Sequence, residues 1–446
     1  MRNNQAQINP SQVYLESLNL IPGGTQLFSK KPELFNKDFW PIYFNSAKGI
    51  SIKTTDGRVL KDMSHMGVGS CVLGYSDKFV SKKVKSVINA GVQSTLIAPE
   101  EIELAEKLVE IHPWAQMVRF ARSGGEAMSI AVRISRVCSG KDVVLFSGYH
   151  GWADWYVAAN LSSEDQLSKV LLPGLSSRGI PAGLADTAIA FEFNDIDRVR
   201  KLVQEYSGRI ASIVMEPRRS EEPLPGYLEE IRAICSREGI VLIFDEITTG
   251  WRACSGGIHL KGNVKPDIAV FAKAMANGHA MSAIIGTREV MEYANASFIS
   301  STNWTERIGP TAALATIEKY MKYDVQNHLA WAGEMVSTGW KNIAESCGIV
   351  IDANDGGLPA LSRFSFKYPF SRGLDVLFCQ LMLEKGWLAH NQFKPSLAHT
   401  KKDIEQYLVS VEQVFNKLAV MIKTNEGFLV EMSDSNPAPS IPRLTK

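Results

Sequence analysis

The stretch Asp267-Ile-Ala-Val-Phe-Ala-Lys273-Ala-Met-Ala-Asn-Gly278 joins an apolar run to a lysine set among small residues. Upstream, Ile240-Val-Leu-Ile-Phe244 is a second apolar run, and it ends in Asp245-Glu246. Both runs have the length and composition of buried strands. We therefore expect two strands of one sheet, one ending in an aspartate and the other in a lysine.

A lysine and an aspartate in this arrangement suit pyridoxal phosphate. The lysine amine can hold the aldehyde of that cofactor as a Schiff base, and the carboxylate can keep its pyridine nitrogen protonated. Apolar and small neighbours would desolvate the amine of Lys273, which favours its neutral, nucleophilic form. The alternatives are a solvated lysine at a strand end and a salt bridge between Asp245 and Arg252.

Length and composition indicate a globular chain with more than one domain. The 446 residues exceed what one hydrophobic core usually supports. With 48 Lys and Arg against 47 Asp and Glu, no strong charge favours nucleic acid or a membrane surface. The six cysteines are scattered without metal-ligand spacing, so we expect free thiols and no metal site. The N-terminus lacks a signal-peptide pattern and no stretch is long and apolar enough to span a membrane, so a cytoplasmic location is expected.

Between about residues 76 and 325, short apolar segments alternate with segments of helical periodicity, which is typical of an α/β domain with a mostly parallel sheet. The expected strands are Val118–Ala121, Val143–Phe146, Ala188–Glu192, Ile210–Glu216, Val241–Asp245 and Ile268–Lys273. The expected helices are Glu101–Ile111, Glu126–Cys138, Ile196–Tyr206 and Tyr227–Glu238.

We expect four parts along the chain. Residues 1–75 form an N-terminal segment that contributes to a small domain, and residues 76–325 form the large domain. Residues 326–432 form the rest of the smaller α+β domain, which includes a helix Val325–Cys347, a strand-rich stretch near Leu361–Tyr368 and a long helix capped by Asp403. Residues 433–446 are proline-rich and are expected to be a disordered tail.

Candidate site residues lie where expected strands end. Ligands gather at the carboxyl ends of parallel strands, and Glu216, Asp245 and Lys273 occupy such ends. The turn Ser147-Gly148-Tyr149-His150-Gly151 follows another strand and could place an aromatic ring on a flat heterocycle. Glu216 could instead cap its loop, and Tyr149 could be an ordinary turn residue.

The turn Ser123-Gly124-Gly125-Glu126 joins an expected strand to an expected helix. Small residues there let backbone N–H groups approach a phosphate at the positive end of the helix dipole. The structural alternative is a simple helix cap with Ser123 as the capping residue. This segment alone leaves both interpretations open.

Taken together, these motifs resemble the class III aminotransferases of pyridoxal-phosphate fold type I, and within them the glutamate-1-semialdehyde 2,1-aminomutase-like proteins. The resemblance extends from about Pro22 to Ile422. The matching pieces are Pro22-Gly-Gly24, Ser123-Gly124-x-Glu126-Ala127, Tyr149-His150-Gly151, Glu216-Pro217, Asp245-Glu246-x-x-Thr249-Gly250, Lys273, Gly309-Pro310 and His399-Thr400.

The resemblance implies a role for each matching residue. Lys273 forms the internal aldimine, Asp245 pairs with the pyridine nitrogen, and Ile247 packs against the ring opposite Tyr149. Thr305 reaches the phosphate from a neighbouring subunit, which implies a homodimer with shared active sites. The implied catalytic residues are Lys273 and Asp245. The implied cofactor-binding residues are Ser123, Gly124, Gly125, Tyr149, His150, Glu216, Asp245, Ile247, Lys273 and Thr305.

Some positions depart from the aminomutase pattern. Gly125 replaces a threonine in the phosphate turn, Met66 replaces a tryptophan, and Leu27 and Lys30 replace a serine and an arginine. The stretch Trp304–Ile308 replaces a glycine-rich one. Substrate recognition is therefore expected to differ.

Three functions follow as hypotheses. The favoured one is an aminotransferase that moves an amino group between a donor and an aldehyde or ketone acceptor through a pyridoxamine form of the cofactor. The second is an aminomutase, and the third is a pyridoxal-phosphate-binding protein without turnover. A nucleotide-binding dehydrogenase is disfavoured, because the glycine spacing in Gly67–Gly74 does not match the dinucleotide fingerprint.

Overall fold

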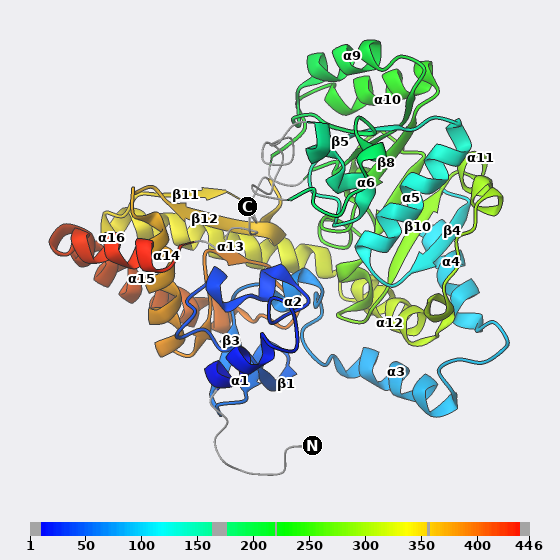
Figure 1. The fold of residues 1–446 in the computed structure, drawn as a ribbon. Helices are drawn as coiled ribbons and strands as arrows, with labels where there is room; N and C mark the ends of the chain where they lie inside the picture. Colours follow the sequence, from blue (N-terminus) through cyan, green and yellow to red (C-terminus); the bar gives the residue numbers. More distant parts are fainter. Residues whose placement is uncertain (1–9, 163–175, 219–220, 355–356, 438–446) are drawn as a thin grey trace. The chain divides into compact units, whose positions relative to one another are not determined.

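The computed structural model describes residues 10–162, 176–218, 221–354 and 357–437. These residues divide into two compact units. The larger unit runs from Lys78 to Gln326, and the smaller unit combines the described residues up to Asp77 with the described residues after Gln326. Figure 1 shows both units coloured along the sequence.

The larger unit is built on a seven-stranded sheet in its described part, with strand order β4-β10-β9-β8-β7-β5-β6. The strands are β4 (Met117–Ala121), β5 (Val143–Ser147), β6 (Ala188–Ala190), β7 (Ile210–Met215), β8 (Val241–Asp245), β9 (Ile268–Phe271) and β10 (Ser282–Gly286). Strand β10 runs antiparallel to both of its neighbours, and the pairs from β9 to β6 are parallel. The predicted mostly parallel α/β sheet is therefore confirmed.

Helices cover both faces of this sheet (Figure 1). Along β7, alternate side chains enter different cores: Val214 packs with helix α5 (Gly124–Ser139), and Ile213 and Met215 pack with α9 (Ile196–Glu205) and α10 (Tyr227–Glu238). This two-residue alternation is the normal consequence of strand geometry. Both faces are thus buried, and polar groups are left to gather at the strand ends.

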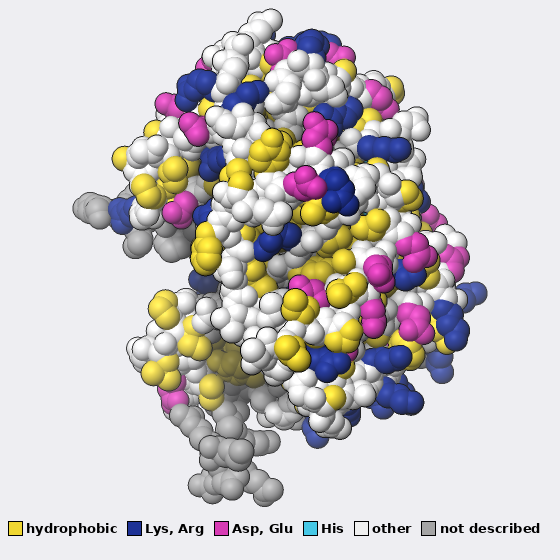
Figure 2. Space-filling view, turned by 90° about the vertical axis from the view of Figure 1, so that its right-hand side faces the viewer, with side chains coloured by type: hydrophobic (Ala, Val, Ile, Leu, Met, Phe, Trp, Pro, Cys, Tyr) yellow, Lys and Arg dark blue, Asp and Glu magenta, His cyan; other side chains and the backbone are white. Residues whose placement is uncertain are grey.

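The other described elements of the larger unit are helical or 3-10 segments. Helix α12 packs on α3, α4 and η5. Their bounds are α3 (Lys78–Ala90), α4 (Pro99–Ile111), α6 (Asp154–Val157), α7 (Ala159–Ser162), α11 (Arg288–Met291), α12 (Ile308–Lys322), η3 (Ala182–Leu184), η4 (Ile258–Lys261), η5 (Lys273–Ala276), η6 (Glu292–Ala296) and η7 (Thr302–Thr305). On the described part of the face in Figure 2, acidic and basic side chains are interspersed rather than gathered by sign.

The smaller unit combines two sheets with long helices around an aromatic core. Its sheets have the orders β1-β2-β3-β13 and β11-β12-β14. The strands are β1 (Phe44–Lys48), β2 (Ser51–Thr54), β3 (Val59–Asp62), β11 (Ile351–Asn354), β12 (Ser362–Phe366), β13 (Trp387–Leu388) and β14 (Gln392–Phe393). The helices are α1 (Pro10–Ser17), α2 (Met66–Gly69), α13 (Val325–Cys347), α14 (Ser371–Glu384), α15 (Lys401–Thr424) and α16 (Glu426–Ser435), with 3-10 turns at Phe28–Lys30, Pro32–Leu34 and Pro359–Leu361.

Several expected boundaries differ from the structure: the strand expected at Ala188–Glu192 ends at Ala190, and the one expected at Ile210–Glu216 ends at Met215. Three further differences concern α15, β9 and the C-terminal tail. Helix α15 is capped by Thr400, whose hydroxyl accepts from Asp403 N, while Asp403 returns the bond as the third helical residue. Strand β9 ends at Phe271, because Lys273 turns into η5. Helix α16 continues to Ser435, inside the tail expected from residue 433, and residues 438–446 lie outside the described part.

Candidate active site

Parallel pairing brings the carboxyl ends of four strands to one edge of the large sheet. Ser147 pairs with Met215, and Met215 pairs with Phe244. Asp245, one residue further along β8, pairs with Val270 of β9. The turns that carry Tyr149, Glu216 and Lys273 begin directly beyond these positions, so this edge collects most of the predicted site residues.

Asp245 is a buried carboxylate with defined partners. The residue has an exposed fraction of only 2%. Oδ1 accepts from Ile247 N at 2.9 Å, and Oδ2 lies 2.8 Å from His150 Nδ1. Arg252, the alternative partner, donates its Nε to Thr248 O at 2.7 Å. The recorded ionic partner of Asp245 is therefore His150, which sequence spacing alone did not identify.

The hydrogen bonds of His150 fix the number of protons on this pair. Its Nε2 lies 3.0 Å from Ser147 O, and a carbonyl can only accept, so Nε2 carries a proton. Nδ1 faces Asp245, so a second proton lies between that nitrogen and the carboxylate. Either assignment makes the buried pair neutral overall. A neutral pair avoids the large cost of burying a lone carboxylate.

Lys273 is held at both ends of its side chain. Its backbone has φ 43°, a left-handed conformation that is uncommon for a residue with a Cβ. Its Nζ donates to Thr248 Oγ1 at 2.8 Å. Backbone strain of this kind concentrates at functional sites. The amine therefore has a defined position at the carboxyl edge.

The turn before α5 caps this helix and also has the small residues that suit the binding of a phosphate. Ser123 and Glu126 form a capping box, which confirms the cap interpretation of Ser123. A Cβ on Gly124 would lie 2.9 Å from Ile247 Cδ1, and one on Gly125 would lie 2.8 Å from Trp152 Nε1. Glycine at both positions lets Ile247 and Trp152 approach the backbone at the start of α5, where the first N–H groups of a helix can hold a phosphate.

Tyr149 and Glu216 occupy neighbouring turns at the same edge. Tyr149 is partly buried on the core beneath α5, and its ring meets Tyr156 edge-on with centroids 6.0 Å apart. Glu216 is buried, and a Cβ on Gly148 would lie 3.0 Å from its Oε2. Gly148 itself has φ 108°, so a larger residue would be strained there.

Thr305 lies in a 3-10 helix rather than in a turn that follows a strand. It ends the exposed 3-10 helix η7, where its hydroxyl donates to Thr302 O and accepts from Gln93 Nε2. Its neighbour Trp304 donates Nε1 to Glu126 Oε1 at 3.3 Å. Within this chain, Thr305 is thus surface-exposed and its role stays a prediction.

Glu246 anchors the turn that follows Asp245. It is fully buried and accepts from His259 N at 3.0 Å, His259 Nδ1 at 2.7 Å and Thr249 Oγ1 at 2.5 Å. Burial alone would raise the pKa of Glu246, but hydrogen bonds from His259 and Thr249 outweigh it and lower that pKa. Trp114 donates to the second nitrogen of His259, which fixes the neutral tautomer. The turn is therefore rigid.

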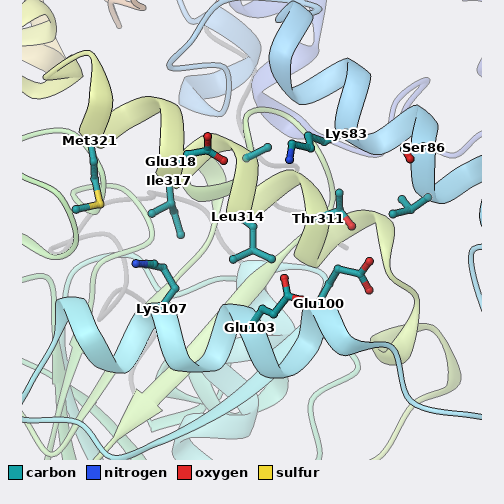
Figure 3. A pocket seen from close by; sticks show the side chains of 12 residues that line it. Lys83, Ser86, Glu100, Glu103, Lys107, Thr311, Leu314, Ile317, Glu318 and Met321 are labelled. Atoms are coloured by element: carbon teal, nitrogen blue, oxygen red, sulfur yellow. The ribbon is translucent and has the colours of Figure 1, made fainter.

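A separate cavity lies between α3, α4 and α12, away from these residues (Figure 3). Its volume is about 540 Å³. Lysine and glutamate side chains line it together with apolar ones, among them Lys83, Lys107, Glu103 and Glu318. It contains no predicted site residue. Among the described residues, no cluster of His, Cys, Asp or Glu has the composition and number for a metal site.

Two site residues were missed by the sequence reasoning. Thr248 lies inside the motif that was quoted, but its contact with Lys273 depends on how the turn folds. Trp152 follows Gly151 and has an exposed fraction of 72%, beside the position that Gly125 leaves open. The signals available in the sequence were a threonine three positions after Asp245 and a tryptophan in the stretch that contains Gly148 and Gly151.

Comparison with known proteins identifies the family of this chain. The family model for class-III aminotransferases matches residues 35–413. The 3-aminobutyryl-CoA aminotransferase of Cloacimonas acidaminovorans (strain Evry) is 28% identical over 422 residues, which cover 90% of this chain and 97% of that protein.

Solved structures share the fold. The FumI protein of Sphingopyxis sp. MTA144, in its pyridoxal-phosphate internal aldimine form, superposes with a TM-score of 0.84 at 20% identity, covering 94% of this chain and 99% of that one. A glutamate-1-semialdehyde aminomutase from Pseudomonas aeruginosa PAO1 gives 0.78 at 19% identity, covering 92% and 94%. The predicted pyridoxal-phosphate fold type I is confirmed.

Proposed function

The chain belongs to the class-III aminotransferases, enzymes that depend on pyridoxal phosphate, and we propose that it transfers amino groups between two separate molecules. The observation that carries this proposal is the buried Asp245–His150 pair at the same sheet edge as Lys273. A carboxylate of this kind suits a protonated ring nitrogen, and the lysine suits an aldehyde.

The residues present fit the cofactor. Asp245 would hold the ring nitrogen, with His150 orienting its carboxylate, and Ile247 and Tyr149 would lie against the ring. The turn of Gly124 and Gly125 would offer backbone N–H groups to the phosphate, with Ser123 shaping the cap. Glu216 would line the site from the turn that follows β7. Sequence and site geometry support these roles together.

Bound pyridoxal phosphate supplies an aldehyde that condenses with amines and a ring that accepts the electron pair left on a deprotonated carbon. Lys273 would bind the aldehyde, and its released amine would carry the proton from the donor carbon. Asp245 would favour a proton on the ring nitrogen, because its carboxylate is a buried anion at that position, and His150 would hold the carboxylate in place through its hydrogen bond.

We propose a donor whose amino group is not on the carbon next to a carboxylate. The relative from Cloacimonas acidaminovorans is named for 3-aminobutyryl-CoA, in which the amine lies on the third carbon, and it matches 90% of this chain. An aldehyde or ketone would accept the amino group in the second half of the reaction. The alternative is an intramolecular transfer, since an aminomutase shares the fold.

A donor screen tests this proposal. The protein loaded with pyridoxal phosphate is mixed separately with 3-aminobutyrate, alanine, glutamate and glutamate-1-semialdehyde. Loss of the cofactor's visible absorbance with release of a 3-oxo acid from 3-aminobutyrate supports the proposal. Turnover of glutamate-1-semialdehyde without a second substrate supports the mutase instead. Cofactor binding with no response to any donor favours a protein without turnover.

We also propose a homodimer with shared active sites in the cytoplasm. Thr305 is exposed, and Gln93 ties its helix to the segment that carries Leu96 and Ile97, whose exposed fractions are 81% and 75%. Exposed apolar side chains of this size often mark an interface. All six cysteines are free, which suits a reducing compartment, and no described helix is long and apolar enough to cross a membrane.

Sedimentation velocity tests the dimer. The wild-type protein is expected at twice the chain mass, and Leu96→Asp together with Ile97→Asp is expected to shift it toward the monomer and weaken cofactor retention. The matched control Val59→Asp alters a residue of the smaller unit with an exposed fraction of 66%. A wild-type protein that sediments as a monomer at micromolar concentration contradicts the proposal.

A further inference from the structure

Three residues at the end of β8 and in the turn that follows it contact three different parts of the site. Asp245 faces His150, and the Ile247 side chain lies against Gly124. Thr248 then points its hydroxyl at Lys273, with Oγ1 and Nζ 2.8 Å apart. One short segment thus supplies the proposed ring-nitrogen residue and contacts the phosphate turn and the lysine.

This segment is braced from both sides. Gly250 N donates to Glu246 O at 2.7 Å, and Arg252 Nε donates to Thr248 O at 2.7 Å. A Cβ on Gly250 would lie 2.7 Å from Phe271 Cδ1, so the turn packs directly on β9. Bracing of this kind leaves the hydroxyl of Thr248 little freedom to move away.

The side chain of Lys273, in contrast to this braced turn, is flexible on its own. A lysine stem loses rotamer entropy when it is ordered. The left-handed backbone at Lys273 fixes where the stem begins, and the Thr248 hydroxyl fixes where it ends. Ordering a reactive group before the reaction is a large source of rate enhancement.

We propose that Thr248 is a positioning residue, which holds the amine of Lys273 by accepting a hydrogen bond at its carboxyl-edge position. The proposal rests on the proposed function and deepens it, because the held amine is the one that would bind the cofactor aldehyde. A hydroxyl accepts from a protonated nitrogen and thereby favours the protonated form. Removing that hydroxyl therefore makes the nitrogen lose its proton at lower pH.

Thr248→Val and Thr248→Ser separate the hydroxyl from the shape of the side chain. Valine keeps the branched shape without the acceptor, and serine keeps the acceptor. The matched control is Thr187→Val, since Thr187 also makes one hydroxyl bond of 2.7 Å, to Leu184 O, before edge strand β6. Each protein is studied with bound pyridoxal phosphate and again after the cofactor is removed.

Two pH titrations provide the readouts. The first follows the visible absorbance of the bound cofactor, and the second follows trace acetylation of Lys273 in the cofactor-free protein by mass spectrometry. In Thr248→Val, both midpoints are expected to fall by about one pH unit, the size of one lost hydrogen bond to a charged group. Thr248→Ser is expected to restore the wild-type midpoints.

Midpoints in Thr248→Val that match those of Thr187→Val overturn the positioning role. A serine variant that behaves like the valine variant overturns it as well, since the hydroxyl is then not the cause. Failure of the proposed function is distinguishable, because wild-type protein that binds no cofactor gives no absorbance titration, whereas acetylation of Lys273 still measures the contact with Thr248.

Discussion

Asp245 carries the clearest prediction at the scale of single residues. Asp245→Asn keeps the size of the side chain and removes its negative charge beside His150. The rate at which a donor amine converts the bound cofactor is expected to fall at least about 100-fold, or about 3 kcal/mol in barrier. Stopped-flow absorbance in a single turnover measures this rate.

The control for this variant is Asp267→Asn. Asp267 is a partly buried carboxylate of the larger unit, and it binds Arg232 and Leu242 N at the start of β9. Its loss is expected to alter stability and leave the single-turnover rate within about threefold. Equal rates for wild type and Asp245→Asn contradict the assigned role of Asp245.

The two glycines of the phosphate turn are expected to respond differently to the same change. In Gly124→Ala, the new methyl group meets Ile247, which is packed on the core. In Gly125→Ala, it meets the far end of Trp152, which is largely exposed and can swing away. We expect Gly124→Ala to weaken pyridoxal phosphate binding at least about tenfold more than Gly125→Ala, as equilibrium titration would show. Equal effects contradict this packing argument.

At the scale of elements, the capping box of α15 gives a testable stability. Thr400→Ala removes the hydroxyl that satisfies Asp403 N and is expected to lower the free energy of unfolding by about 1 kcal/mol. Thr424→Ala is the control, because its exposed hydroxyl only returns to Val420 O at the other end of the helix. Urea denaturation followed by circular dichroism compares the two. An effect no larger than that of Thr424→Ala contradicts the cap.

Helices and strands that have a clear local sequence pattern were predicted with accurate ends. Strand Val241–Asp245 and helix Tyr227–Glu238 have the expected ends, because apolar runs and periodicity mark them. Strand β10 was missed, since a five-residue segment buried on both faces shows no alternation. The expected cap Asp403 is instead the third helical residue, because Thr400 and Asp403 bond each other reciprocally and Thr400 takes the N-cap position.

The site residues likewise include some that could be predicted from the sequence and some that could not. Residues that end strands, such as Asp245, could be predicted from the sequence because a polar group after an apolar run is conspicuous. The partners could not be predicted, because they are set by the fold: His150 reaches Asp245 from another strand, and Thr248 reaches Lys273 across two turns. Pairing between distant residues requires the sheet register and the turn geometry.

At the scale of the whole molecule, buried histidines predict sensitivity to acid. Burial lowers the pKa of His390 to about 3 and that of His112 to about 4, and it lowers the pKa of His65 well below 6.5. The unfolded chain therefore binds more protons than the folded one between these values and about 6.5. Stability is lost as the pH falls from about 6.5, because the folded state must take up charge that burial opposes.

Urea midpoints at pH 7 and pH 5 measure this loss, and the midpoint is expected to be lower at pH 5. His390→Gln is expected to reduce the difference, since it removes a buried imidazole that lies 4.2 Å from the His65 ring, centroid to centroid. His279→Gln, at a partly exposed position, is the control and is expected to keep the difference. Midpoints that do not change with pH contradict the prediction.

Site mapping of the cofactor tests the central claim most directly. Purified protein is incubated with pyridoxal phosphate, the linkage is reduced with borohydride, and peptides are identified by mass spectrometry. We expect a phosphopyridoxyl group on Lys273 and none on that peptide in Lys273→Ala. Labelling at another lysine, or no labelling of the wild-type protein with excess cofactor, would contradict it.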